Sequence, residues 1–495
     1  MSPPPSPSGS GAQGLSPKAG LAILLLGLAL LRLISAAATP LTEDEAYYRL
    51  WSQHLQLGYF DHPPMTAWWI RGGILLVGDN PLGVRLASVL ASLLATLIVF
   101  DLGRMLGNER TGFRAALLYN CTLTIAAAGA LAVPDAPAGL FWALTLWALA
   151  KGDGRAGIRW WVAAGAAAGL AALSKYSALF LAPGAVLWLG LTEAGRKTLA
   201  RPGPWIAAAI AVGVFCLNIG WNAAHHWVTF DKQFGRAAAT RFAPRYLVEF
   251  AIGQFLLLNP AVAVLAGIGA VSAWRARAMH RLPWLMLAST MPFLAYLALH
   301  SLHDRVQAHW PAPLYAGAAA LAAWAVDQAG DWRAILARLA PAGLGLGVLA
   351  VAHAALPATD FGSRDPALQL RGWPAFAQAV DAVRQGVGAG WVGTLSYGVS
   401  AQLQAANPSG APTVQINERE RYEGLAPAIA PDLNRPGLIV DLDRRLDLAA
   451  LRACFAQVGP VVPINRGALQ TADTHYGAVR VSGPSRDLLS RGCSP

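Results

Sequence analysis

The chain has 495 residues, of which 55% are hydrophobic and only 13% are charged. A soluble domain carries roughly 25% charged residues, so this composition excludes an ordinary soluble protein and indicates a polytopic membrane protein. It also excludes intrinsic disorder, a secreted disulfide scaffold and a coiled coil as the main architecture. A net charge of +11 can indicate nucleic-acid binding, but basic loops on one side of a membrane explain most of the excess positive charge.

The composition changes near residue 357. Residues 1–356 hold 25 Lys and Arg against 15 Asp and Glu, whereas residues 357–495 hold 13 against 12. We therefore expect a disordered cytoplasmic tail over 1–19, rich in Pro, Ser and Gly, and a transmembrane domain over 20–356. The more polar remainder, 357–495, is expected to form a soluble domain.

Apolar runs of about 20 residues predict membrane-spanning helices. We expect eleven, at about 20–38, 82–103, 113–133, 136–150, 160–174, 177–192, 204–221, 247–273, 282–299, 310–327 and 339–356. The first run could also be a cleaved signal sequence, but the spans that follow favour an uncleaved helix. Every second short loop is rich in Arg or Lys, and the positive-inside rule places these loops in the cytoplasm. The C-terminal domain then lies outside.

The first outer loop, 39–81, carries two amphipathic segments, at 44–57 and 65–77. The C-terminal domain alternates helix and strand patterns and predicts a small α/β fold. Its expected helices are 373–385 and 448–457, and its expected strands are 391–397, 413–416, 438–442 and 476–481. It has no Gly-rich phosphate loop, so we assign it no nucleotide. Cys454 and Cys493 could pair if the domain lies outside the cytosol.

Unusual polar residues gather on the expected outer side, and we expect them to share one cavity. On a helix, one face would carry Asp44, Tyr47, Tyr48 and Trp51. A carboxylate beside aromatic rings suits a sugar, whose C–H face packs on rings while its hydroxyls seek acceptors. Glu45 stands three residues after Thr42, so a capping box is its structural alternative.

Two further acidic residues lie in short outer segments. Asp61 precedes His62-Pro63-Pro64 and is held in an extended stretch, and Asp135 begins a helix after almost no loop. An ordinary proline turn and a helix cap are the alternative explanations. Two such carboxylates with a histidine could hold a divalent metal.

Cations on the outer side need an explanation of their own. Lys175 lies in a very short outer turn, where snorkelling to the membrane surface is the alternative to a function. Arg241 and Arg245 break the positive-inside pattern, and a lipid phosphate is the natural partner for them. His309 belongs to the last outer loop.

These motifs together resemble a known family. The strings Asp44-Glu45-Ala46-Tyr47-Tyr48 and Gly58-Tyr59-Phe60-Asp61-His62-Pro63-Pro64 look like the first-loop signature of family 39-type glycosyltransferases of the GT-C superfamily. Further motifs at similar places are Pro134-Asp135-Ala136, Leu173-Ser174-Lys175-Tyr176, Trp221-Asn222 and Arg371-Gly372-Trp373. The group is similar to protein O-mannosyltransferases, lipid A aminoarabinose transferases and lipopolysaccharide galacturonosyltransferases.

The resemblance implies an inverting transferase that moves a sugar from a polyprenyl-phosphate donor. The acceptor would be lipid A, lipopolysaccharide core, another glycan or a protein, on the periplasmic face of the bacterial inner membrane. Together with the residue pattern it predicts catalysis by Asp44 and Glu45, and a possible divalent metal at Asp61 and Asp135. The predicted donor- and acceptor-binding residues are Tyr48, Tyr59, His62, Lys175, Arg241, Arg245 and His309. His62 stands where aminoarabinose transferases have a lysine. This difference argues against aminoarabinose as the sugar and weakens the case for a bound metal.

A transporter or flippase of a lipid-linked sugar is the alternative function, and a non-catalytic envelope scaffold is a third. A transporter also needs polar groups at membrane depth. It would show charges near the midplane of several spans and two related halves. Here the charges concentrate at outer turns and no internal repeat is evident, so the transferase is favoured.

Overall fold

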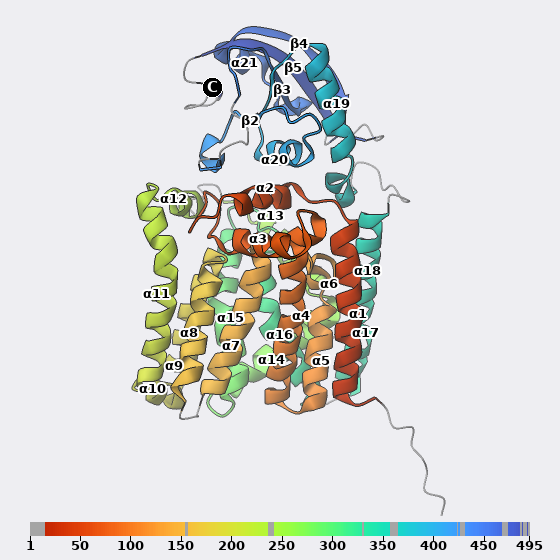
Figure 1. Ribbon diagram of the computed structural model, residues 1–495. Helices are drawn as coiled ribbons and strands as arrows, with labels where there is room; N and C mark the ends of the chain where they lie inside the picture. The colour runs from red at the N-terminus through yellow and green to blue at the C-terminus, as the bar shows by residue number, and fades with distance from the viewer. Residues whose placement is uncertain are drawn as a thin grey trace, which may run out of the picture.

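The computed structural model describes residues 15–153, 157–235, 242–328, 331–356, 365–422, 424–425, 431–467, 474–485, 488 and 493. A bundle of helices forms one part of the molecule, and a mixed α/β domain sits on one end of it (Figure 1). The predicted fold class, a mainly helical membrane protein with a small α/β domain, is confirmed. Most of the tail predicted over 1–19, and the domain boundary near 357, lie outside the described residues.

The helices of the bundle and the first loop follow the predicted order. They are α1 (Pro17–Ala38), α2 (Glu43–Gln53), α3 (Met65–Val77), α4 (Pro81–Leu106), α5 (Glu109–Asn120), α6 (Leu123–Ala128), α7 (Asp135–Gly152), α8 (Ile158–Ala172), η1 (Tyr176–Phe180), α9 (Leu181–Gly190), α10 (Glu193–Leu199), α11 (Pro202–Ala224), α12 (Val228–Gly235), α13 (Arg245–Leu257), α14 (Pro260–Arg275), α15 (Arg281–His300), η2 (Ala312–Leu314), α16 (Tyr315–Asp327), α17 (Asp331–Leu339) and α18 (Ala342–Ala355). Among the described residues, five segments are long and apolar enough to cross a membrane, or seven if each of two bent pairs is one span. The number eleven therefore stays a prediction.

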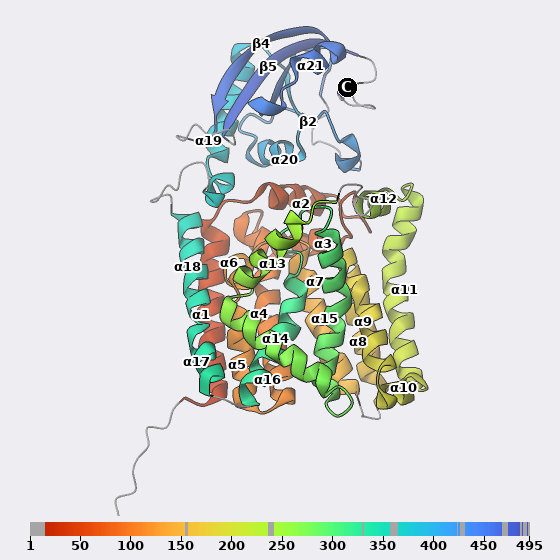
Figure 2. The same ribbon diagram turned by 180° about the vertical axis from the view of Figure 1, so that it is seen from behind.

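Two predicted spans are broken in the structure, and one of them is the run 113–133, which is divided between α5 and the short helix α6. The run 247–273 forms two helices, α13 and α14, which meet at an angle of 103°. Asn259 has a φ of 72°, its side chain accepts a hydrogen bond from the backbone of Ala261, and Pro260 begins α14. A capping residue followed by proline at the first helical position starts a new helix, so the prediction of one continuous helix is wrong. Figure 2 shows α14 crossing the bundle obliquely, with α13 at its upper end.

The first outer loop forms the two predicted amphipathic helices, α2 and α3, which lie across the end of the bundle beneath the α/β domain (Figure 1). Helix α2 begins with the predicted capping box between Thr42 and Glu45. Its buried face includes Tyr47 and Trp51, each at most 1% exposed. Burial of this face fixes α2 between the two parts of the molecule.

The C-terminal domain contains a five-stranded sheet in the order β2-β1-β3-β5-β4. Its strands are β1 (Trp391–Thr394), β2 (Thr413–Gln415), β3 (Gly437–Leu442), β4 (Phe455–Asn465) and β5 (His475–Pro484), and its helices are α19 (Trp373–Gly386), α20 (Tyr397–Ala406) and α21 (Leu448–Cys454), with short 3-10 turns η4 (Pro366–Leu370), η5 (Arg419–Tyr422) and η6 (Asp443–Arg445). Strands β2, β1 and β3 are parallel, whereas β5 and β4 are antiparallel to their neighbours.

Most predicted elements of this domain are confirmed, but α20 and β4 were not foreseen. The strand predicted to reach 397 ends at Thr394 because α20 follows, and the helix predicted to reach 457 ends at Cys454 because β4 begins. The sequence does not predict β4 because prolines at 460 and 463 argue against a strand. Within a sheet, proline is tolerated mainly in edge strands, and β4 is an edge strand. Cys454 and Cys493 form a disulfide, the pairing that the sequence allowed.

Candidate functional site

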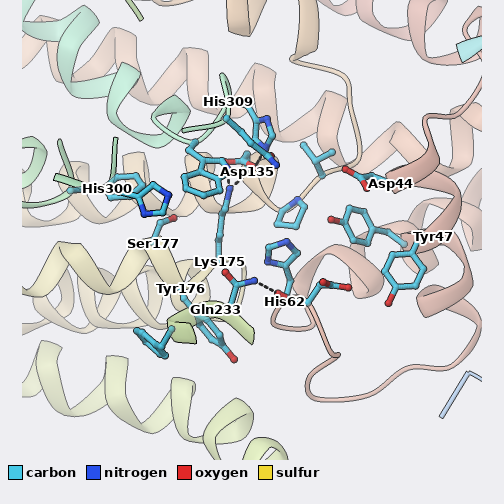
Figure 3. Close-up of a pocket in the computed structure, with 18 of the residues that line it drawn as sticks. Asp44, Tyr47, His62, Asp135, Lys175, Tyr176, Ser177, Gln233, His300 and His309 are labelled. Atoms are coloured by element: carbon cyan, nitrogen blue, oxygen red, sulfur yellow. Dashed lines mark hydrogen bonds and ion pairs between the residues drawn. The ribbon is translucent and has the colours of Figure 1, made fainter. Parts of the chain in front are cut away.

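A cavity of about 250 Å³ lies where the bundle meets the C-terminal domain (Figure 3). Its lining is rich in ionisable and aromatic side chains, among them Asp44, Tyr47, Tyr48, Asp61, His62, Asp135, Lys175, Tyr176, Phe180, Gln233, Phe293, Tyr296, His300, His309, Tyr397 and Arg421. In Figure 3, Asp135, Lys175 and His309 lie together, whereas Asp44 and Tyr47 lie on the other side. Part of the predicted gathering is therefore observed: of the outer-side polar residues expected in one cavity, those that line it are Asp44, Asp61, His62, Asp135, Lys175 and His309.

One side of the cavity holds a tight charged group. The ammonium of Lys175 lies 2.8 Å and 2.9 Å from the two carboxylate oxygens of Asp135. Both side chains are nearly buried, at 12% and 7% exposed, and the Nε2 atom of His309 lies 3.5 Å from Asp135. Burial lowers the pKa of His309 despite the neighbouring carboxylate, which favours the neutral imidazole. Lys175 is thus a fixed cation facing the cavity.

Asp44 is the reactive candidate on the opposite side. It lies in the first turn of α2, and the hydroxyl of Tyr397 donates to its Oδ1 atom at 2.8 Å. Within the described part of the chain, no Lys, Arg or His lies within ion-pair distance of Asp44. Its second oxygen therefore has no fixed cation to neutralise it, which suits a group that accepts a proton.

Asp61, in contrast, is neutralised by the C-terminal domain. The Nη1 atom of Arg421 lies 2.5 Å from its Oδ2 atom, and the two side chains are 8% and 9% exposed. Arg421 also stacks over the ring of Tyr397, at 4.3 Å from the centroid. The backbone carbonyl of Asp61 accepts a hydrogen bond from Gln233 at 2.6 Å.

The two carboxylates predicted to bind a metal thus belong to separate ion pairs. Among the described residues, no group of three or more His, Cys, Asp or Glu side chains could hold a metal ion. A metal would have to displace Arg421 from Asp61 or Lys175 from Asp135, so these residues do not fit a metal as they stand. The metal remains a prediction that elemental analysis of the purified protein can test, and no step below depends on it.

Several predicted site residues lie elsewhere. Glu45 is fully buried and accepts two hydrogen bonds from Arg85, at 2.7 Å and 2.6 Å, and one from the backbone of Ala132. Tyr59 is 3% exposed and stacks on Trp51 rather than lining the cavity. Neither side chain lines the cavity, so the geometry does not support their predicted roles at the site, which stay predictions.

Of the two predicted arginines, Arg245 is the one that the structure describes, and it does not line the cavity. Arg245 stacks on Tyr246 at an exposed position outside the cavity lining, and Arg241 lies outside the described residues. All the other predicted site residues line the cavity. They are Asp44, Tyr48, Asp61, His62, Asp135, Lys175 and His309.

Sequence reasoning missed the contribution of the C-terminal domain. Tyr397 and Arg421 reach Asp44 and Asp61 across more than 350 residues of sequence. It also missed the aromatic wall formed by Phe180, Phe293 and Tyr296, whose rings lie 5.1 to 6.4 Å apart. Neither group forms a local motif, so only the fold reveals them.

Known proteins match this chain over much of its length. A family model described as dolichyl-phosphate-mannose-protein mannosyltransferase matches residues 61–221. The chain is 30% identical over 316 residues to the lipid A galacturonosyltransferase RgtD of Rhizobium johnstonii, covering 63% of this chain and 66% of that protein. It is 35% identical over 158 residues to an undecaprenyl phosphate-alpha-4-amino-4-deoxy-L-arabinose arabinosyl transferase of Pseudomonas aeruginosa, covering 28% and 29%. The matched segments thus span less than two thirds of either relative.

Solved structures share the fold. The crystal structure of ArnT from Cupriavidus metallidurans bound to undecaprenyl phosphate has a TM-score of 0.61 and 17% identity, covering 94% of this chain and 99% of that one. The apo form of the same protein gives a TM-score of 0.62 over 95% and 100%. At this identity the likeness establishes the architecture alone.

Proposed function

Because the chain belongs to the GT-C superfamily of membrane glycosyltransferases, we propose that it transfers a sugar from a polyprenyl phosphate to a cell-envelope glycolipid, with lipid A as the first candidate. The observation that carries the proposal is the cavity itself. It places a carboxylate without a fixed cation, Asp44, across from the buried cation Lys175. In a single displacement the acceptor oxygen approaches one side of the anomeric carbon and the phosphate leaves from the other. The carboxylate and the cation must therefore lie on opposite sides of that carbon.

The reaction breaks the bond between the anomeric carbon and the phosphate oxygen and forms a bond to the acceptor oxygen. The leaving group is a phosphate monoester, which is stable as an anion, so no strong general acid is needed. Lys175 stabilises the negative charge that develops on the phosphate. Asp44 takes the proton from an acceptor hydroxyl, and a single displacement inverts the anomeric centre. If the acceptor is itself a phosphate, Asp44 positions groups instead.

The cavity has surfaces for both the sugar and the lipid part of the donor. Tyr47 and Tyr48 provide ring faces beside Asp44 for the sugar, while Phe180, Phe293 and Tyr296 provide an apolar wall for the first prenyl units. The cavity lies on the side of the bundle that the positive-inside rule places outside the cytoplasm. The Cys454–Cys493 disulfide in the adjoining domain fits an oxidising compartment, so we assign the site to the periplasmic face of the inner membrane.

The decisive experiment uses purified protein in liposomes with undecaprenyl phosphate that carries galacturonate or 4-amino-4-deoxy-arabinose. Release of undecaprenyl phosphate that depends on added lipid A supports the transferase. A flippase would move the donor between leaflets and leave it intact. If the protein releases no undecaprenyl phosphate from either donor when lipid A is present, the proposal is contradicted.

Lys175→Ala should mainly weaken use of the lipid donor. A hydrogen bond to a charged group contributes about 1.5–3 kcal/mol, so we expect the donor KM to rise roughly 10- to 100-fold. Lys175→Arg should retain part of the affinity. As a matched control, Lys197→Ala removes a lysine whose ion pair with Glu193 is exposed, and donor use should not change. An unchanged donor KM in Lys175→Ala would favour the snorkelling explanation.

A further inference from the structure

The C-terminal domain turns the carboxyl ends of its parallel strands toward the cavity. The order β2-β1-β3 places β1 at the point where successive connections run in opposite directions. In open α/β sheets, this edge is where ligands normally bind. Tyr397 follows β1 by three residues, and Arg421 follows β2 by six. In Figure 1, α20, which begins at this edge, lies directly above α2.

The first outer loop occupies the space at this edge of the sheet. The side chain of Glu43 lies against Gly398 in the first turn of α20, where a Cβ atom would come within 2.4 Å of the Glu43 carboxylate. A carboxylate at this end of a helix is favoured by the helix dipole. The amide of Gln402 donates to the carbonyl of Leu41 at 2.8 Å. The position that an α/β domain usually offers to a ligand is therefore occupied by the loop that carries Asp44.

Two side chains extend beyond this interface into the cavity. The Tyr397 hydroxyl donates to Asp44, and the Arg421 guanidinium binds Asp61. The two side chains also contact each other, because Arg421 lies over the Tyr397 ring. They are the residues of the C-terminal domain that line the cavity.

The domain fixes Tyr397 through hydrogen bonds. Asp441, at the end of β3, accepts hydrogen bonds from the backbone of Leu395 at 3.0 Å and from the hydroxyl of Ser396 at 3.3 Å, which fixes the start of α20. The Tyr422 hydroxyl donates to the carbonyl of Tyr397 at 2.8 Å. Supporting bonds of this kind fix a side chain before substrate arrives.

We propose that the C-terminal domain completes the catalytic centre, with Tyr397 and Arg421 as positioning residues for Asp44 and Asp61. This inference rests on the proposed transferase function. Tyr397 binds one oxygen of Asp44 and leaves the other to accept the proton of the acceptor hydroxyl. Arg421 neutralises Asp61 and, by lying over the Tyr397 ring, helps to hold the hydroxyl that binds Asp44. The domain thus acts in catalysis rather than only in recognition of the acceptor.

Tyr397→Phe tests the proposal because it keeps the ring and removes the hydroxyl. We expect kcat to fall about tenfold or more, as for loss of a hydrogen bond to a charged group, while the donor KM and the melting temperature stay unchanged. A matched control removes a contact of the same domain that lies outside the cavity lining: Gln402→Ala. This variant should keep kcat within twofold. If Gln402→Ala lowers kcat as much as Tyr397→Phe does, the contacts serve only docking and the proposal is overturned.

Arg421 is tested by a conservative pair of variants. Arg421→Lys keeps the charge and should retain more turnover than Arg421→Gln, which removes the guanidinium from Asp61. Adding Asp61→Asn to Arg421→Gln should restore the melting temperature without restoring kcat. A double variant with normal kcat would show that the pair only stabilises the fold. If wild-type protein transfers no sugar, the proposed function fails; if it is active and Tyr397→Phe is equally active, only this inference fails.

Discussion

Asp44→Asn should abolish most transfer while leaving the protein folded. A positioned general base typically accelerates a reaction by roughly 10²- to 10⁴-fold, and this is the loss expected in kcat. The fold should survive because Asp44 forms no ion pair among the described residues, and an Asn side chain can still accept the hydrogen bond from Tyr397. The measurement is acceptor-dependent release of undecaprenyl phosphate, compared with the melting temperature of the same preparation.

A control from the same loop keeps this result specific. Asp79 is also an aspartate of the first outer loop, but it pairs with Arg49 at the surface, at 2.5 and 2.6 Å, away from the cavity. Asp79→Asn should retain near-normal kcat. If Asp44→Asn turns over within a few-fold of wild type, Asp44 takes no part in proton transfer.

Composition and local patterns predicted much of the fold, because membrane burial and helix capping act locally. The apolar runs locate the helices of the bundle, and the spacing of Thr42 and Glu45 predicts the start of α2. The break at Asn259 shows the limit of this reasoning. Mean hydropathy is high on both sides, and only the capping geometry of Asn259 before Pro260 separates α13 from α14.

The candidate site was predictable only where its residues fall in short motifs. Asp61, Asp135 and Lys175 lie next to aromatic or proline residues, Asp44 lies one helical turn before Tyr47 and Tyr48, and all four line the cavity. Glu45 lies next to Asp44 in the sequence but pairs with Arg85 away from the cavity, because adjacent residues on a helix face different directions. Arg421 could not be found, because its role depends on a partner, Asp61, in another domain.

Glu45→Gln should produce the largest loss of stability. Glu45 and Arg85 form an ion pair in which both side chains are at most 1% exposed. Removing one charge leaves the other buried without a partner, which costs about 3–5 kcal/mol. The substitution also weakens the capping box and the bond from the Ala132 backbone. A lowered melting temperature and a reduced yield of monodisperse protein in detergent are the expected results.

The pH dependence of this stabilisation has a definite sign. Burial alone would raise the pKa of Glu45, but the Arg85 guanidinium and its hydrogen bonds lower it overall. The contribution of the pair is therefore fully present above the ordinary carboxyl pKa of about 4.3 and is lost as the pH falls through the lowered value. Glu45→Gln protein should lack this part of the acid-induced destabilisation.

Two companion variants separate structure from catalysis at Glu45. Glu193→Gln breaks an exposed pair with Lys197 and should change the free energy of unfolding by less than about 1 kcal/mol. Combining Glu45→Gln with Arg85→Met removes both buried charges and should recover much of the stability. If that stable double variant also transfers sugar, Glu45 acts only by holding α2 in place. A double variant that is folded but inactive would restore the catalytic role that the sequence assigned to Glu45.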